Sequence, residues 1–184
     1  MGESREALPR RIPSVVPGVR MASFGSLPGQ VATARQWCWH GSGLSFDRAY
    51  PLLTVVSELH TNALTHTASG RPFGRVRLRM ERHGGLFQIA VTDDGAVGGR
   101  EPTVPVVGGG YGLRLVEELS RAWGWFGRPG EPLTVWAVVD PRAEETRGSG
   151  TAPQARRLTR PGGAGLRERN RGAGGAPRPN VLWL

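Results

Sequence analysis

Glu58 and Asn62 are two residues of this chain whose types and spacing suit catalysis. They lie four residues apart, so on a helix both side chains would share one face. An Asn carbonyl is a neutral oxygen ligand of the kind that Mg²⁺ accepts together with phosphates and water. A carboxylate beside it is placed to take a proton from a hydroxyl group or a water molecule. The spacing therefore indicates a metal ligand next to a general base, and a solvated helix flank is the alternative.

A second cluster, Asp93-Asp94-Gly95, follows an apolar stretch that predicts a strand. The carboxylate of Asp93 would suit an acceptor for the amino group of an adenine base. Gly95 has no side chain, so the backbone there could approach the base closely. An ordinary Asp-Asp-Gly turn is the alternative interpretation of the same residues.

A third cluster is rich in glycine and opens a predicted helix: Gly108-Gly109-Gly110-Tyr111-Gly112-Leu113. Free N–H groups and the helix dipole at such a position favour phosphate, and a flexible hinge is the alternative. A Walker phosphate-binding loop is excluded because it needs a lysine and the chain has none. The dinucleotide fingerprint needs a strand directly before the glycines, whereas a long loop precedes these.

Two helices are expected before the second cluster. The first spans residues 27–39, with Pro28 in its first turn. The second spans Phe46–His66, carries both Glu58 and Asn62, and has Asp47 as its predicted N-cap. Its apolar residues recur at helical spacing and predict one buried stripe, formed by Leu52, Val55, Val56, Leu59 and Ala63.

The remaining elements are mostly strands. Residues 75–81 alternate between apolar and charged side chains, and 86–91 return after a glycine turn, so the pair predicts an antiparallel hairpin. A long loop, 96–109, leads to a helix over 111–123 and to strands over 123–127 and 133–140. Helices on one face of a largely antiparallel sheet make an α+β two-layer sandwich.

Charge divides the chain into three parts. Residues 1–20 carry four Arg and two Glu, and residues 141–184 carry nine Arg and three Glu, whereas 21–140 are close to neutral. We therefore expect a flexible N-terminal arm over 1–20, a folded domain over 21–140 and a disordered Arg/Gly/Pro-rich tail over 141–184. A basic tail can touch nucleic acid. A solubilising end is the simpler interpretation, so nucleic-acid binding is not favoured.

The chain has a single cysteine, Cys38, which excludes an internal disulfide and suits a reducing compartment. No apolar run approaches the length of a membrane-spanning helix, which is roughly 20 residues. The first twenty residues have no apolar segment of the kind that secretory signals contain. These features predict a cytoplasmic protein without a membrane segment.

The three clusters in series resemble the nucleotide-contacting boxes of the GHKL superfamily, which includes the histidine kinases. They are most similar to the stand-alone domains of the anti-sigma-factor serine kinase group of actinobacteria. The resemblance covers about residues 32–139 and rests on five ordered motifs. These are Val56-Ser57-Glu58-Leu59 with Thr61-Asn62-Ala63 and His66; Val91-Thr92-Asp93-Asp94-Gly95; Gly110-Tyr111-Gly112-Leu113-Arg114-Leu115-Val116; Ala122-Trp123-Gly124-Trp125; and Thr134-Val135-Trp136.

This resemblance implies the Bergerat ATP-binding fold, with ATP and Mg²⁺ as cofactors. Asn62 would hold Mg²⁺, Glu58 would activate the acceptor, and Asp93 would bind adenine with Thr134 beside it. Residues 96–109 would form the lid over ATP. The other residues implied to contact the nucleotide are Gly95, Gly110, Gly112 and Leu113.

The resemblance also implies a function. Members of the group phosphorylate a serine of an anti-anti-sigma factor or bind a sigma factor, so we expect a serine/threonine kinase with a protein partner of this type. A homodimer is left open. The sequence departs from the group at Tyr111, where Arg is usual, at His60, where an aliphatic residue is common, and in its short lid. A nucleotide-sensing module without phosphotransfer is therefore the alternative function.

Overall fold

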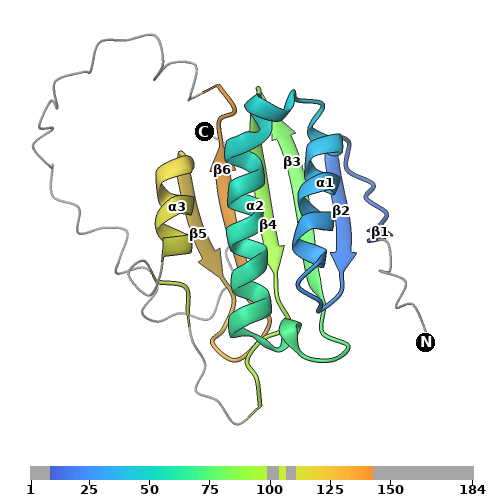
Figure 1. The fold of residues 1–184 in the computed structure, drawn as a ribbon, viewed down its shortest axis with the longest axis vertical. Helices are drawn as coiled ribbons and strands as arrows, with labels where there is room; N and C mark the ends of the chain where they lie inside the picture. Colours follow the sequence, from blue (N-terminus) through green and yellow to red (C-terminus); the bar gives the residue numbers. More distant parts are fainter. Residues whose placement is uncertain (1–8, 99–103, 107–110, 143–184) are drawn as a thin grey trace, which may run out of the picture. The chain divides into compact units, whose positions relative to one another are not determined.

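A computed structural model describes residues 9–98, 104–106 and 111–142. Within these residues, six strands form one antiparallel sheet, and three α-helices lie on one face of it (Figure 1). The strand order is β1-β2-β3-β4-β6-β5. The expected α+β fold is confirmed. The elements are β1 (Arg10–Ile12), β2 (Val19–Phe24), α1 (Gln30–Ser42), α2 (Phe46–His66), β3 (Val76–His83), β4 (Leu86–Thr92), α3 (Tyr111–Leu119), β5 (Ala122–Phe126) and β6 (Thr134–Val139).

Helix α2 lies at the centre of the helical layer, and its bounds agree with the prediction. Every residue of the expected apolar stripe is buried, as is typical of the helix face that packs against the core. The N-cap assignment was wrong, because Ser45 occupies that position with extended backbone and makes no side-chain cap bond. Asp47 lies in the first turn instead, where its negative charge still suits the helix dipole.

The hairpin of β3 and β4 also agrees with the prediction. Val76, Leu78 and Met80 are buried on the helix-facing side, as their alternation indicated. Gly84 and Gly85 connect the strands with positive φ angles of 54° and 90°, the conformation that a two-residue hairpin turn requires. Strand β4 ends at Thr92, so the cluster that begins at Asp93 lies just beyond the C-terminal end of a central strand.

Strands β1 and β2 were not expected, and they include part of the stretch assigned to the N-terminal arm. Strand β2 pairs with β3 over its whole length and buries Ala22 and Phe24 against the helices. Its partner lies about fifty residues further along the chain, so the pairing gives no local signal. Residues 1–8 lie outside the described residues, as does the predicted tail from residue 143 onward.

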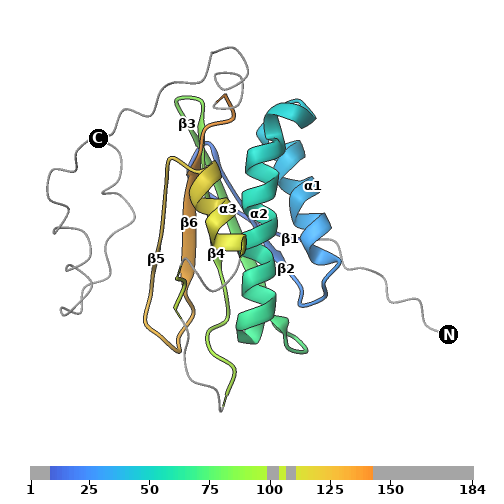
Figure 2. The ribbon, with the colours of Figure 1, turned by 60° about the vertical axis from the view of Figure 1, so that its left-hand side comes forward.

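Two helix bounds also differ from the expectation. Helix α1 runs from Gln30 to Ser42 and ends at Gly43, whose left-handed backbone is a common helix stop. Helix α3 ends at Leu119 because the following residues pair with β6 as strand β5. In the view of Figure 2, α3 lies beside α2 on the same side of the sheet. None of the described helices is both long and apolar enough to cross a membrane.

Candidate nucleotide-binding site

A cavity of about 280 Å³ lies between the helices and the ends of two strands. Its walls come from the C-terminal half of α2, the end of β4, the start of β6, the start of α3 and residues 104–106. Asn62, Asp93, Gly112 and Leu113 all line it, so the structure brings together residues from all three sequence clusters. These residues span more than fifty positions in the chain, and only the packing of α2 and α3 beside β4 places them side by side.

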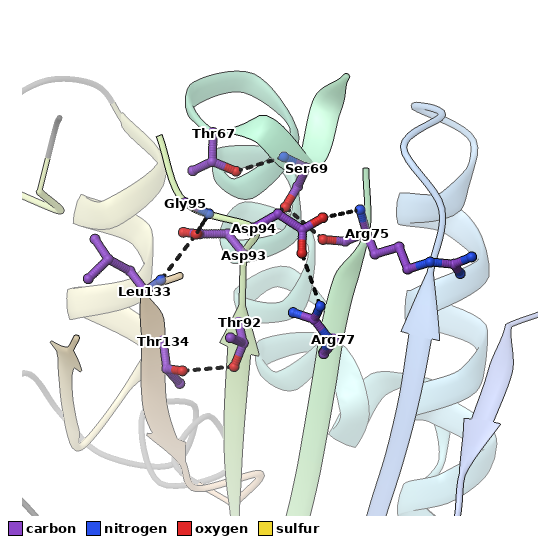
Figure 3. A network of polar contacts seen from close by, with 10 residues as sticks. All are labelled: Thr67, Ser69, Arg75, Arg77, Thr92, Asp93, Asp94, Gly95, Leu133 and Thr134. Atoms are coloured by element: carbon purple, nitrogen blue, oxygen red, sulfur yellow. Dashed lines mark hydrogen bonds and ion pairs between the residues drawn. The ribbon is translucent and has the colours of Figure 1, made fainter. Parts of the chain in front are cut away.

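Asp93 is buried at one end of this cavity, with 7% of its surface exposed. Its Oδ1 accepts hydrogen bonds from the backbone N–H groups of Gly95 (2.6 Å) and Leu133 (3.1 Å), as Figure 3 shows. Burial raises the pKa of the Asp93 carboxyl, and the two backbone hydrogen bonds oppose that shift. Among the described residues both of these bonds go to Oδ1, and the second carboxylate oxygen, Oδ2, can also accept a hydrogen bond.

Glu58, Asn62 and Gly112 meet at the other end. A methyl group placed on Gly112 would lie 2.6 Å from Glu58 Oε2 and 3.6 Å from Asn62 Oδ1. Glu58 and Asn62 therefore share a face of α2, as their spacing indicated, and that face lies directly against the start of α3. Of the two, Asn62 lines the cavity and Glu58 lies outside its lining.

The walls between these two ends are apolar. They are formed mainly by Leu59, Ala63, Val91, Leu113, Leu133 and Val135. A mainly apolar lining with a few polar groups is typical of a small-molecule site. Leu133 was not among the predicted site residues, although it supplies both a wall side chain and the N–H group that holds Asp93.

Thr134 is not brought into the cavity. It pairs in register with Thr92, and the two hydroxyl oxygens are 2.8 Å apart (Figure 3). Side chains alternate along a strand, so Leu133 and Val135 face the cavity while Thr134 faces the opposite side of the sheet. Thr134 thus lies outside the cavity lining, and its predicted contact with the base stays a prediction.

Gly95 also has a conformational reason to be glycine, and its predicted close approach to a base stays a prediction. Its φ is +85°, and a Cβ there would lie 2.8 Å from the carbonyl oxygen of Gly130. The space above Gly95 is thus filled by the turn before β6, and the glycine serves the tight bend that points its N–H at Asp93. Gly95 also borders a smaller cavity of about 120 Å³ that adjoins the first one at Asp93.

The predicted glycine cluster and the predicted lid lie only partly within the described residues. Gly110 lies outside the described residues, whereas Gly112 and Leu113 line the cavity as expected. Within the predicted lid, residues 104–106 line the cavity. The described residues hold no group of three or more His, Cys, Asp or Glu side chains that could bind a metal. A Mg²⁺ ion here would thus use Asn62 with oxygen atoms of the nucleotide and water, a donor set that Mg²⁺ accepts.

Residues 24–138 match the histidine kinase-like ATPase domain family, and the chain belongs to this family. A search of curated proteins found no match. Among solved structures, the chain is similar to the histidine kinase domain from the Erythrobacter litoralis EL346 blue-light activated histidine kinase, with 23% identity and a TM-score of 0.41. The similarity covers 66% of this chain and 64% of that structure.

Proposed function

We propose that this protein binds Mg-ATP in the cavity and transfers the γ-phosphate to a serine or threonine of a protein partner, as an anti-sigma-type kinase. The partner would be an anti-anti-sigma factor, or a sigma factor that the protein sequesters. The observation that carries the proposal is the shared cavity, which has a buried carboxylate at one end and Asn62 beside a helix N-terminus at the other. Membership of the ATPase family supports ATP as the ligand.

At the adenine end, the proposed interaction is a hydrogen bond from the adenine amino group to Asp93 Oδ2. Because Oδ1 is already held by two backbone N–H groups, the carboxylate has a fixed orientation before the ligand arrives. A preoriented acceptor loses little conformational freedom on binding. The apolar walls would then enclose the two faces of the ring.

At the phosphate end, Asn62 would hold Mg²⁺ and the N-terminus of α3 would face the phosphates. Bound Mg²⁺ would neutralise developing charge on the phosphate oxygens. Glu58 would take the proton from the acceptor hydroxyl as its oxygen attacks the γ-phosphorus and the bond to ADP breaks. Its position outside the cavity lining but next to Gly112 suits a group that meets the acceptor and not the nucleotide.

The binding step is tested by calorimetry of the full chain with Mg-ATP. Wild type should bind saturably, and Asp93→Asn should weaken binding by roughly 5- to 150-fold, because a buried hydrogen bond of this kind contributes on the order of 1–3 kcal/mol. Asp47→Asn is the matched control, because Asp47 is exposed in the first turn of α2, away from the C-terminal half of that helix that lines the cavity. Absence of any heat at millimolar ATP would refute the proposal.

The transfer step is tested with labelled ATP and candidate partner proteins. Asn62→Ala should damage ATP binding and transfer together. Glu58→Ala should keep ATP affinity and slow transfer by roughly 10²- to 10⁴-fold, the usual contribution of a positioned general base. Glu117→Ala, an exposed acid on α3, is the control. Equal transfer by Glu58→Ala and wild type would show that Glu58 is a solvated helix residue.

A nucleotide-sensing module without phosphotransfer is the second candidate. It is favoured by Tyr111, which is 84% exposed at the start of α3 and brings no positive charge to the phosphate end. Wild type that binds Mg-ATP but transfers nothing to any candidate partner would favour this function over the kinase. Tyr111→Arg would then be the first variant to examine for restored transfer.

A further inference from the structure

We infer that Ser69 is a positioning residue that holds the adenine-binding carboxylate of Asp93 in place without touching the ligand. This inference rests on the proposed function of the cavity. Ser69 lies in the short 3-10 turn Ala68–Gly70 that follows α2, and its side chain is fully buried. It is absent from the lining of the cavity, so any effect on binding must act through other residues.

The Ser69 hydroxyl group connects two strands, as Figure 3 shows. It donates a hydrogen bond to the carbonyl oxygen of Arg75, just before β3 (2.7 Å), and accepts one from the N–H of Asp94, just after β4 (2.9 Å). That N–H belongs to the peptide group that joins Asp93 to Asp94. Ser69 therefore holds the backbone immediately after Asp93, where a small rotation would redirect the Asp93 side chain.

The same turn is bonded to the Asp93 cluster at a second point. The N–H of Ala68 donates to the carbonyl oxygen of Gly95 (2.8 Å). Gly95 in turn donates its N–H to Asp93 Oδ1. The two contacts hold both ends of the segment from Asp94 to Gly95, so its backbone is kept where it can orient the carboxylate.

Ser69 itself is fixed to helix α2. Its N–H donates to the Thr67 hydroxyl (3.2 Å), and that hydroxyl donates to the carbonyl oxygen of Ala63 (2.6 Å). Ala63 follows Asn62, the proposed magnesium ligand. This chain of hydrogen bonds fixes the Ser69 turn to the C-terminal end of α2, so Ser69 holds the backbone after Asp93 from a rigid element.

The side chain of Asp94 also holds the backbone after Asp93 in place, through contacts nearer the protein surface. Its carboxylate accepts the N–H of Arg75 (2.6 Å) and pairs with the guanidinium of Arg77 (3.1 Å). These contacts hold the turn to β3, but Arg77 and Asp94 are partly exposed, whereas the Ser69 side chain is fully buried. We therefore expect Ser69 to contribute more to the position of Asp93 than Arg77 does.

The test compares adenosine, ADP and Mg-ATP binding to the full chain. Ser69→Ala should weaken all three by the same factor, about tenfold, because the loss is confined to the adenine end. The transfer rate at saturating ATP should stay within about twofold of wild type, which separates a binding effect from a catalytic one. Ser69→Thr keeps the hydroxyl group and should recover most of the affinity.

Ser42→Ala is a matched control. Ser42 is also buried, and its hydroxyl also donates to one backbone carbonyl (Trp39, 2.7 Å) and accepts one backbone N–H (Leu44, 3.2 Å), but at the C-terminal end of α1. It should lose thermal stability with unchanged nucleotide affinity. If Ser69→Ala does not fold, Ser69→Cys, which nearly keeps the volume but is a weak donor, should show the same uniform loss.

The inference is overturned if folded Ser69→Ala or Ser69→Cys binds adenosine within about twofold of wild type while wild type binds normally. It is also overturned if the loss grows with the number of phosphates, because the effect would then lie at the other end of the site. Failure of wild type to bind any nucleotide would instead refute the proposed function.

Discussion

His60 should make the free energy of unfolding of this protein fall at acidic pH. The residue lies on α2 with none of its surface exposed, and its ring packs against the ring of Phe24, 5.5 Å between centroids. Neither ring nitrogen has a hydrogen-bond partner among the described residues. Burial lowers the pKa of His60 from 6.5 to about 4, because the charged form would lose its water without gaining a partner.

The sign of this pH dependence follows from the number of protons that the folded and unfolded states bind. Between pH 6.5 and 4 the unfolded chain binds a proton at this residue and the folded chain does not, so stability falls as the pH falls. Above pH 6.5 both states are neutral and the effect vanishes. With these pKa values, the free energy of unfolding should drop by about 2 kcal/mol between pH 8 and pH 5 and by about 3 kcal/mol at pH 4.

The perturbation that isolates this effect is His60→Leu. Leucine has no polar atoms to bury, so the variant should be at least as stable as wild type at pH 8. It also lacks the titration, so its advantage over wild type should widen by about 2 kcal/mol at pH 5. Other groups titrate in both proteins and cancel in the difference.

The assay is urea unfolding of both proteins at pH 8, 6.5 and 5. His40→Leu is the control, because His40 is exposed and its replacement should not produce the same widening. Parallel curves for wild type and His60→Leu across this range would refute the reasoning, since they would show that His60 is protonated as easily in the folded protein as in the unfolded chain.

Three further outcomes are expected. Gly112→Ala should lower phosphotransfer and Mg-ATP affinity, because its methyl group would lie 2.6 Å from Glu58 Oε2. Calorimetry would measure the affinity and labelled ATP the transfer, and wild-type values of both would contradict the prediction. Cys38 is fully buried with the pKa of its thiol raised by burial, so Ellman's reagent should label it only when the protein unfolds, and fast labelling of native protein would contradict this. Deleting residues 144–184 should leave the melting temperature nearly unchanged, because a segment so rich in Gly, Pro and Arg can bury little apolar surface. A large drop in the melting temperature would show that the segment packs on the domain.

The predictable part of the fold is the part with strong local periodicity. Helix α2 and the β3–β4 hairpin match the expectation closely because each shows a clear apolar pattern over at least six residues. Strands β1 and β2 could not be found in this way. The first has three residues, and the second acquires its partner only when β3 is brought beside it.

Part of the candidate site could also be predicted. Through the resemblance of their clusters to the boxes of a known family, Glu58, Asn62, Asp93 and Gly112 indicated a nucleotide site, and the structure places three of them, Asn62, Asp93 and Gly112, in the lining of one cavity. The hydrogen bonds that orient Asp93 were not predictable, because they come from Leu133 and from the turn at Ser69. Neither residue has a side chain whose type indicates a role in a site.

The sequence alone determined which chemical groups the site contains and the approximate elements that carry them. The tertiary structure decided which of two adjacent residues, Leu133 or Thr134, faces the cavity. That choice depends on the register in which β6 pairs with β4, where Thr92 lies opposite Thr134. Side chains alternate between the two faces of a sheet, so a shift of one residue would exchange every inward and outward side chain of the strand.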